Sequence, residues 1–429
     1  MDVITTAVTA GASEGGISAA YQMLKSRLAG KSPAVADAIA DIEQDPGSQS
    51  RQFALSDALA AAGLAGDRYL RAAARNLIDE VEKRRQSRLA IQPAAGDLAQ
   101  APNHALMKLW FATDRELTGD RHPARLFGGA RGTLRYGSCE VSIPREHRMG
   151  ELESPSLLRL EFRADPEHHV VLASVEISDS AACLSQLKDA IQQGSEKSAL
   201  LFVHGYRVTF EDAARRTGQL AYDLGYKGVP VFYSWPSQGK LAGYIVDEAN
   251  VEWTLPHLTA FLTEFLERSS AEHVYLLAHS MGNRAMARAV AAVAESRPDL
   301  AGKLREVILT APDIDADVFR QQIAPALAKA AHPVTLYASS DDAALQVSKH
   351  VHGYPRAGES GPGLVVTQGV ETIDATGVDT GFIRHSYFAE RRSALSDMYY
   401  LIHQNTRAGE RFGLQPVDGG AGRYWVFRE

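Results

Sequence analysis

The stretch VYLLAHSMGNR, residues 274–284, passes from an apolar run into small and polar residues within a few positions. Its first half predicts a buried β-strand, and a helical pattern begins near Asn283. Between the two lies AHSMG, residues 278–282, which is a small-x-Ser-x-Gly sequence. A strand, such a turn and a helix in succession make a nucleophile elbow, which holds a serine hydroxyl above a sheet. The sequence therefore predicts that Ser280 is a nucleophile and not only a turn residue.

The elbow restricts the residues on either side of its serine. The two arms of so sharp a turn lie close together, so the residues two positions before and two positions after the serine must be small. Gly282 meets this need fully, and Ala278 meets it less freely than the commoner glycine would. The turn also sets the hydroxyl beside the N-terminus of the next helix.

A nucleophilic serine needs a histidine base and an acid that orients the base, here in the chain order serine, acid, histidine. A strand predicted at residues 334–339 is followed at once by two aspartates, and we predict Asp342 as the acid. Asp341 beside it and Asp313 after the preceding strand are the alternatives. Each of these aspartates could instead cap a helix or lie in a loop.

Four histidines lie beyond the predicted acid: His350, His352, His385 and His403. The first two precede the last predicted strand, residues 369–374, and His403 lies within the final predicted helix. Only His385 lies in a loop after that strand and before that helix, from which a base can reach across to the elbow. We therefore predict His385 as the base.

A second apolar run, LLFVHGYRV at residues 200–208, also ends in small and polar residues. The tetrahedral intermediate of acyl transfer carries an oxyanion that two backbone amides can stabilise. We expect one amide from Met281, just after the serine, and the other from Tyr206. Gly205 lets the backbone come close to the substrate, and we expect His204 beside it to shape this loop through hydrogen bonds.

Substrate contacts are expected from loops above the strand ends, and residues 234–253 read as such a loop. The loop mixes aromatic residues with glycines, and we predict Trp235 and Tyr244 as substrate-binding residues together with His204 and Gly205. An apolar, partly mobile wall suits an acyl chain, although a packed surface loop would have a similar composition.

The organisation of the chain changes near residue 100. Residues 1–86 are rich in alanine, and their apolar residues recur at helical spacing, with a stripe of Leu70, Ala74, Leu77 and Val81 that predicts the core of a small helical module. Residues 87–104 read as a linker and residues 105–429 as a catalytic domain. There, apolar strands come to alternate with helices, which predicts a mostly parallel sheet covered on both faces. The predicted strands are residues 106–113, 168–177, 199–204, 229–235, 273–279, 306–311, 334–339 and 369–374.

The composition of the 429 residues, 45% hydrophobic and 23% charged, is that of a globular protein in water. The net charge of −7 argues against nucleic acid as the main partner. The two cysteines, Cys139 and Cys183, form no disulfide framework, which fits a reducing compartment. We see neither a cationic leader at the start nor an apolar run long enough to span a membrane, and we expect a cytoplasmic protein.

The sequence contains no HExxH motif, no cysteine–histidine cluster and no phosphate-binding GxxxxGK[ST] loop. We therefore expect neither a metal nor a cofactor. The glycine-rich stretch RLFGGARGTLRYG, residues 125–137, lacks the strand–loop–helix setting of a nucleotide site, and it reads as a surface loop.

These features together resemble the α/β-hydrolase superfamily, and most closely the bacterial DUF900 family of esterase- or lipase-like hydrolases. The resemblance covers roughly residues 108 to 405, with its segments in order and at the expected gaps. It rests on FATDR, VSIPREHRMGELE, FVHGYRVTFEDAARRTGQLAYDLGYKGVPVFYSWPSQG, LLAHSMGNR, APDID, YASSDDAAL and IRHSYF. It implies an α/β-hydrolase fold, preceded here by a small all-α domain.

The resemblance also implies a serine hydrolase with Ser280, Asp342 and His385 as its triad. Family members often read SND before the acid, whereas this chain reads SDD, which leaves Asp341 open as the acid. The expected substrate is a small-molecule or lipid acyl ester. Amide or thioester cleavage by the same triad, and a catalytically silent scaffold with a hydrolase fold, are the alternatives.

The N-terminal helical module lies outside that resemblance. It looks similar to small alanine-rich helical modules at the front of multidomain bacterial signalling or defence proteins. As a hypothesis, the module recruits or oligomerises the hydrolase, so that a homo-oligomer or a protein partner is expected. The hypothesis includes a role as a lipid-directed effector in bacterial signalling or defence.

Overall fold

The computed structural model describes residues 3–13, 19–44, 48–67, 69–74, 77, 104–149, 152–153, 165–239, 243–330, 333–340, 353–377 and 391–428. The chain divides into two compact units. The first consists of Met1–Asn103 with Glu153–Asp165, and the second of His104–Leu152 with Pro166–Glu429. Each unit has a hydrophobic core of its own.

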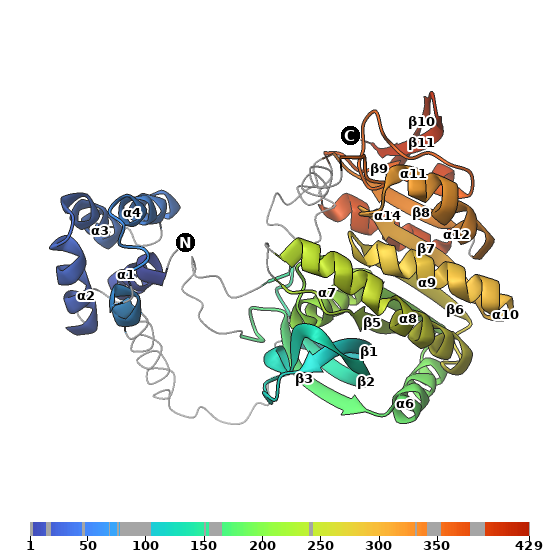
Figure 1. The fold of residues 1–429 in the computed structure, drawn as a ribbon, viewed down its shortest axis with the longest axis horizontal. Helices are drawn as coiled ribbons and strands as arrows, with labels where there is room; N and C mark the ends of the chain where they lie inside the picture. The colour runs from blue at the N-terminus through green and yellow to red at the C-terminus, as the bar shows by residue number, and fades with distance from the viewer. Residues whose placement is uncertain are drawn as a thin grey trace. The chain divides into compact units, whose positions relative to one another are not determined.

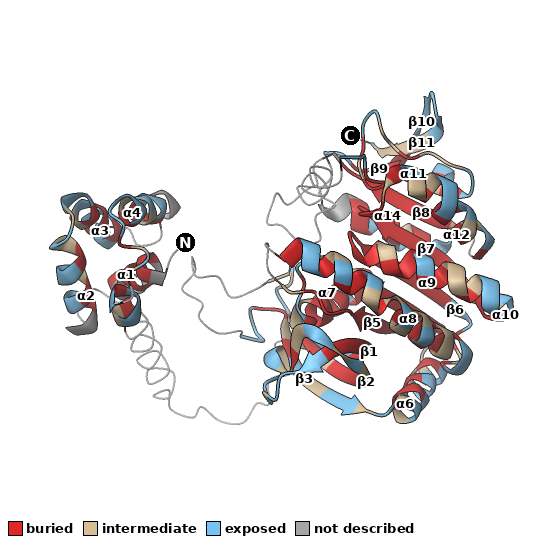
Figure 2. Ribbon diagram, viewed as in Figure 1, coloured by how far each residue is buried: buried red, intermediate tan, exposed pale blue. Residues whose placement is uncertain are grey.

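The first unit is built from short helices, and Figure 2 shows buried inner faces and exposed outer faces on them. The predicted stripe forms part of its core, since Leu70, Ala74 and Leu77 are buried there, whereas Val81 lies outside the described residues. Residues 69–74 are helical. The other helices are α1 (Val3–Ser13), α2 (Ala19–Ala29), α3 (Pro33–Gln44) and α4 (Gln49–Ala61).

An eleven-stranded sheet, in the order β10-β11-β9-β8-β7-β6-β4-β5-β1-β2-β3, forms the centre of the second unit (Figure 1). From β11 to β1 the neighbouring strands are parallel, and antiparallel strands flank them on both sides. Each of the eight predicted segments contains one of these strands in whole or in part. The strands are β1 (His104–Leu117), β2 (Phe127–Pro144), β3 (Val171–Ser178), β4 (Ser198–Val203), β5 (Val229–Ser234), β6 (His273–His279), β7 (Leu304–Thr310), β8 (Val334–Ala338), β9 (Val370–Asp374), β10 (Leu414–Gly419) and β11 (Gly422–Phe427).

Helices cover both faces of this sheet, which explains the continuous apolar runs of its inner strands. In β4, Leu201 and Val203 pack into a core with α6, α8, α9 and α12, whereas Leu200 and Phe202 pack into the opposite core with α7 and α14. The helices are α6 (Ser180–Gln193), α7 (Phe210–Asp223), α8 (Tyr244–Arg268), α9 (Gly282–Ser296), α10 (Pro298–Ala301), α11 (Ala316–Val318), α12 (Ala324–Ala330) and α14 (Arg391–Gln404), with a π-helical turn η4 (Phe319–Ile323) and 3-10 turns η1 (Pro123–Arg125) and η5 (Ala408–Glu410).

The prediction of a surface loop at residues 125–137 was wrong, because most of this stretch belongs to strand β2. Its glycines are needed where other backbone lies close. A side chain on Gly137 would overlap the carbonyl oxygen of Glu176 in β3, and one on Gly132 would lie 2.5 Å from the carbonyl oxygen of Arg115 in β1. The hairpin of β10 and β11 was not predicted at all.

The prediction of a loop at residues 234–253 was wrong in its second half, since helix α8 already begins at Tyr244. The predicted loop therefore includes the first ten residues of this helix. The first half of α8 buries polar residues such as Asp247 and Asn250, and its second half buries apolar residues such as Phe261. A buried polar face has no hydrophobic stripe, which is why the helical period was not visible there.

A buried charge network fixes α14 and the segment after it to strands β7, β8 and β9. Arg411 donates to Asp397 of α14 (2.8 Å) and to Glu371 of β9 (3.2 Å). In β7, Glu306 accepts a hydrogen bond from Thr335 (2.7 Å) and lies 3.4 Å from Arg407. Burial raises the pKa of Glu306 to about 8, although these two partners favour the charged form. Burial therefore outweighs these partners, and the folded protein holds the proton of Glu306 to a higher pH than the unfolded chain does.

The Glu306 carboxyl should make stability depend on pH. Between its ordinary pKa of 4.5 and the folded value of about 8, unfolding releases a proton, so stability falls as pH rises through this window. The slope from this group is about 1.4 kcal/mol per pH unit. We expect Glu306→Gln to gain stability relative to wild type as pH rises from 5 to 8, measured by urea unfolding. Glu371, Asp397, Arg407 and Arg411 are common to both proteins, so a difference that stays constant with pH would contradict the assignment.

Candidate functional site

Ser280 lies on the sharp turn between β6 and α9, with φ at +49°. This left-handed conformation costs a non-glycine residue about 1–3 kcal/mol, so it persists only where the surroundings enforce it. The amide of Ser280 donates to the carbonyl of Thr310 (3.0 Å). Its carbonyl accepts hydrogen bonds from the backbone amides of Asn283 (3.1 Å) and Asp313 (3.2 Å) and from Nδ2 of Asn283 (3.0 Å). The hydrogen bonds hold Ser280 in the conformation that a nucleophile elbow requires.

Two glycines let the ends of β4 and β6 approach each other. A side chain on Gly282 would overlap the carbonyl oxygen of His204, at the end of β4. A Cβ on Gly205 would lie 2.7 Å from Nδ1 of His279 and 3.0 Å from Cβ of Ser280. The two abrupt strand ends seen in the sequence therefore meet, and Ser280 faces the loop that carries Gly205 and Tyr206.

The topology of the sheet places this meeting point where a ligand site is expected. From β4 the chain passes through α7 to β5 on one side, and from β5 it passes through α8, on the opposite face, to β6 on the other side of β4. The strand order reverses between β4 and β6, which creates a crevice outside their carboxyl ends. Ser280 and Gly205 both lie at this edge.

His204 lies behind the loop and is buried. Its ring stacks on Trp235, with the ring centres 5.0 Å apart, and its Nδ1 lies 2.8 Å from the carbonyl oxygen of Gly205. Burial, with a further contribution from Arg115, holds the pKa of His204 well below its ordinary value, so the ring is neutral. A neutral, fully enclosed imidazole is suited to shaping the loop and not to exchanging protons with a substrate.

Helix α8 holds the same loop from its other side. Arg207, directly after Tyr206, has φ at +61°, and its amide lies 3.4 Å from the carboxylate of Asp247 in α8. Asp247 also accepts hydrogen bonds from Ser237 Oγ (2.6 Å) and the amide of Gln238 (2.8 Å). Burial raises the pKa of Asp247, and these hydrogen bonds act in the opposite direction. One carboxylate thus joins the loop after β4 to the loop after β5.

The two aromatic residues predicted to bind substrate lie in different settings. Trp235 has no exposed surface, and its Nε1 donates to the carbonyl of His204 (2.7 Å), so it supports the end of β4. Its role in substrate binding stays a prediction. Tyr244, in the first turn of α8, packs edge-on against Tyr206, with ring centres 5.4 Å apart. Tyr244 therefore lies next to the candidate site.

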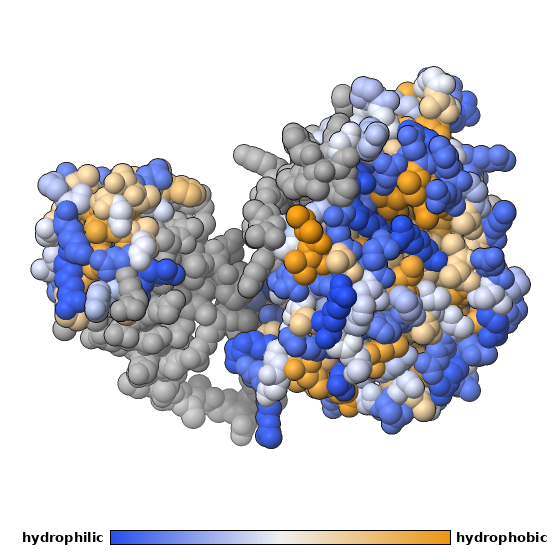
Figure 3. Space-filling view, viewed as in Figure 1, coloured by the Kyte–Doolittle hydropathy of each residue, from blue (hydrophilic) through white to orange (hydrophobic). Residues whose placement is uncertain are grey.

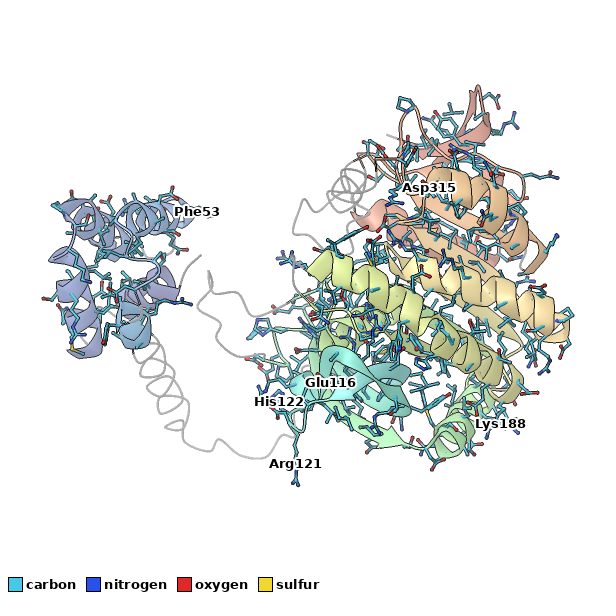
Figure 4. All side chains as sticks on the ribbon, in the orientation of Figure 1. Phe53, Glu116, Arg121, His122, Lys188 and Asp315 are labelled. Atoms are coloured by element: carbon cyan, nitrogen blue, oxygen red, sulfur yellow. The ribbon has the colours of Figure 1, made fainter. Side chains whose placement is uncertain are left out.

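Asp313, one of the alternative acids, lies in a cluster of positive charge. Its carboxylate accepts a hydrogen bond from the hydroxyl of Tyr244 (2.7 Å) and forms ion pairs with Arg284 (3.1 Å) and Arg356 (3.3 Å). Burial opposes the charge of Arg284, but Asp313, Tyr244 and Glu248 raise its pKa above the ordinary value. These contacts favour a structural role for Asp313 beside the elbow. Figure 4 labels Asp315, which marks the same segment after β7.

The other predicted acids and the predicted base, namely Asp341, Asp342 and His385, lie outside the described residues, as do His350 and His352. Their roles stay predictions. His403 is described, and its Nε2 lies 2.7 Å from the carbonyl oxygen of Leu224, where α7 ends. Because α7 begins near the carboxyl end of β4 and runs back along the sheet, His403 lies at the opposite edge from Ser280.

Sequence reasoning gave no role to Asp114 and Arg115, the last two residues of FATDR, although both are buried. Asp114 accepts hydrogen bonds from Thr254 and from Nδ1 of His257 (3.1 Å), which tie β1 to α8. Arg115 contacts the loops after β4 and β5. The available signal was a pair of opposite charges directly after the strand predicted at residues 106–113.

Within the described ranges, no three side chains of histidine, cysteine, aspartate or glutamate gather so that they could hold a metal ion. Nor does that part of the chain contain a helix with the length and apolar character needed to cross a membrane.

The parallel sheet with helices on both faces and the serine turn after β6 define an α/β hydrolase. Residues 179–403, more than half of the chain, match the family described as alpha/beta hydrolase of unknown function (DUF900), and the chain belongs to this family. The resemblance seen in the sequence is thereby confirmed. Residues 1–107 match a second family, the Het-E N-terminal domain, so this match extends through the expected linker. Recruitment or oligomerisation through the N-terminal module stays a prediction.

Solved structures similar to this chain include hydrolases and esterases. A predicted CIB-like hydrolase from Thermoplasma acidophilum is 14% identical over 49% of this chain and 88% of its own, with a TM-score of 0.31. Esterase B from Lactobacillus rhamnosis is 10% identical over 76% of this chain and 96% of its own, with a TM-score of 0.28. A fungal esterase from Rhizomucor miehei is 10% identical over 77% of this chain and 90% of its own, with a TM-score of 0.30. At these values the likeness says nothing about activity. No curated protein matches the chain in sequence.

The close contact between the strand ends predicts a strong effect of Gly282→Ala. The added methyl group would collide with the carbonyl oxygen of His204, so either the elbow or the end of β4 must move. Overpacking of this kind costs about 1–3 kcal/mol. We expect that loss of unfolding free energy in urea denaturation. Gly409→Ala is the matched control, because no atom lies within 4 Å of its added methyl group. Equal stabilities for the two variants would contradict the geometry.

Proposed function

We propose that this protein is a serine hydrolase that cleaves carboxylic esters through an acyl-enzyme intermediate. The observation that carries the proposal is Ser280 at φ +49°, held on the turn between β6 and α9 and opposite Gly205. A serine in this conformation presents its hydroxyl at the crevice between β4 and β6. Three hydrogen-bond donors meet the carbonyl of Ser280 and hold its strained backbone in place. A serine in an ordinary turn would not need such support.

In the proposed reaction, His385 takes the proton of the Ser280 hydroxyl while the oxygen attacks the ester carbonyl. Asp342 orients His385 and stabilises its charged form. The backbone amides of Met281 and Tyr206 donate to the oxyanion of the tetrahedral intermediate. Collapse of this intermediate expels the alcohol, which takes the proton from His385. Water, activated by the same histidine, then releases the acid and restores the serine.

The proposed nucleophile predicts covalent labelling by a fluorophosphonate. The Ser280 oxygen of wild type should displace fluoride from the probe's phosphorus, with loss of the serine proton, so that the protein gains one phosphonyl group, which intact-mass spectrometry and peptide mapping can locate. Ser280→Ala should remain unlabelled, and turnover of p-nitrophenyl butyrate should fall by about 10⁴-fold or more. Ser270→Ala is the matched control, because Ser270 also has a left-handed backbone, with φ at +60°, but follows α8. Labelling of Ser280→Ala at the wild-type rate would refute the assignment.

The same assay separates the candidate acids, since removal of the triad acid should lower the labelling rate strongly. We propose Asp342, so Asp342→Asn should label far more slowly than Asp341→Asn and Asp313→Asn. If His385→Ala labels as fast as wild type, the proposed base is wrong.

We propose that the acyl chain lies against the first turn of α8. Ile245 and Val246 directly follow Tyr244, which packs on Tyr206, and they are 72% and 49% exposed. Figure 3 shows apolar surface over this turn. An exposed apolar pair next to the proposed oxyanion donor would contact the carbons of an ester, so an acyl chain longer than acetyl is the expected substrate.

The acyl-chain proposal predicts a change in specificity for Ile245→Ser. Loss of this contact should remove about 1 kcal/mol of binding for longer chains. The ratio of kcat/KM for p-nitrophenyl octanoate to that for acetate should therefore fall about fivefold. Ile177→Ser is the control, because Ile177 is also an exposed isoleucine (41%) but lies on the edge strand β3. An unchanged ratio in Ile245→Ser would exclude the first turn of α8 as the acyl site.

A further inference from the structure

The guanidinium of Arg115 is buried at the end of β1, where only 1% of the residue is exposed. Burial lowers its pKa to about 10, so the group still carries its charge at neutral pH. Among the described residues, no carboxylate lies within ion-pairing distance of it. Backbone carbonyls solvate the charge instead, those of Gly128 (3.0 Å), Ser237 (2.9 Å) and Val208 (2.7 Å). Asp114, Asp247 and Asp212 favour the charge without contacting the guanidinium. A buried charge that is not in direct contact with a carboxylate is costly, so its position calls for an explanation beyond packing.

The same guanidinium fixes the tautomer of His204. Nη2 of Arg115 lies 3.3 Å from Nε2 of His204, and an arginine can only donate. Nε2 must therefore accept, and the neutral ring carries its proton on Nδ1. This proton is donated to the carbonyl oxygen of Gly205, 2.8 Å away. Ser234 supports the arrangement, because its hydroxyl accepts from Nε of Arg115 (2.8 Å) and can donate to Nε2 of His204 (3.2 Å).

The hydrogen bond from His204 determines the direction of the next amide. In a trans peptide the carbonyl and the N–H point in opposite directions. The carbonyl of Gly205 points to His204, whose ring lies with Trp235, Ser234 and Arg115, on the β5 and β1 side of β4. The N–H of Tyr206 in the same peptide plane therefore points to the β6 side. Ser280 lies on that side, next to Gly205.

We propose that Arg115 is a positioning residue, which selects the Nδ1-protonated tautomer of His204 and so turns the Tyr206 amide toward the oxyanion formed at Ser280. The inference rests on the proposed function, because an oxyanion forms there only if Ser280 reacts. It adds that the orientation of one donor depends on strand β1, two strands away from β4. A wrong tautomer would place a lone pair against the Gly205 carbonyl, and this peptide could then rotate.

Loss of Arg115 should therefore lower kcat more than it changes KM. Removal of one oxyanion donor lowers kcat by about 10²–10³-fold, and a misdirected donor should approach the lower figure. We expect Arg115→Met to lose at least about 30-fold in kcat with p-nitrophenyl butyrate, with KM within about threefold of wild type. Arg121→Gln is the control, because Arg121 lies on the same hairpin and projects outward (Figure 4). A folded Arg115→Met with kcat within twofold of wild type would overturn the proposal.

A pair of His204 variants tests the relay even if Arg115→Met fails to fold. The amide nitrogen of asparagine can occupy the place of Nδ1 and donate to the Gly205 carbonyl, whereas the glutamine amide occupies the place of Nε2. His204→Asn should therefore keep at least about tenfold more of the wild-type kcat than His204→Gln. Equal kcat values in these two variants would overturn the proposal, since a purely structural role would not favour the asparagine.

The tautomer of His204 can be determined by a measurement that does not depend on enzymatic activity. Nitrogen NMR of protein with labelled histidine should show that His204 of wild type is protonated on Nδ1 and unprotonated on Nε2. In Arg115→Met the protonation of the two ring nitrogens should differ from this. An Nε2-protonated ring in wild type would overturn the proposal. If wild type neither hydrolyses esters nor reacts with fluorophosphonate, the proposed function fails, while the NMR result still decides whether Arg115 sets the tautomer.

Discussion

The close approach of β4 and β6 is the constraint on which the rest of the site depends. Gly205 and Gly282 each face backbone or side-chain atoms of the other strand end, at distances that leave no room for a Cβ. This approach brings the loop of Tyr206 opposite Ser280, whose backbone is left-handed. The hydrogen bonds from Asn283 and Asp313 to its carbonyl then offset the strain. The proposed chemistry depends on the way in which these two neighbouring parallel strands end.

Buried polar side chains hold the loops around this contact. Asp247 of α8 joins the loop after β4 to the loop after β5, and Arg115 of β1 contacts the same two loops. Both are almost fully buried. Such groups contribute little to net stability, because their desolvation offsets their hydrogen bonds. Their main effect is on the orientation of the loops, since each donor or acceptor fixes the direction of a particular peptide group.

Local sequence patterns predicted much of the fold and the serine turn, because an apolar strand, a small-x-Ser-x-Gly turn and a helix follow one another directly. They failed where a pattern was broken by burial of unusual residues. The start of α8 was missed because Asp247, Asn250 and Thr254 face inward. Strand β2 was missed because its glycines accommodate neighbouring backbone. Arg115 was missed because its partners, Val208 and Ser237, lie about a hundred residues away, at a distance that no local period reveals.

The most direct test of this account is a crystal structure of the protein after reaction with a fluorophosphonate. We predict phosphorus bonded to Oγ of Ser280, with one phosphonyl oxygen about 3 Å from the amide nitrogens of both Met281 and Tyr206. The carbonyl of Gly205 should still point to Nδ1 of His204. A phosphonyl group on another residue, or an oxygen directed away from the Tyr206 amide, would contradict the account.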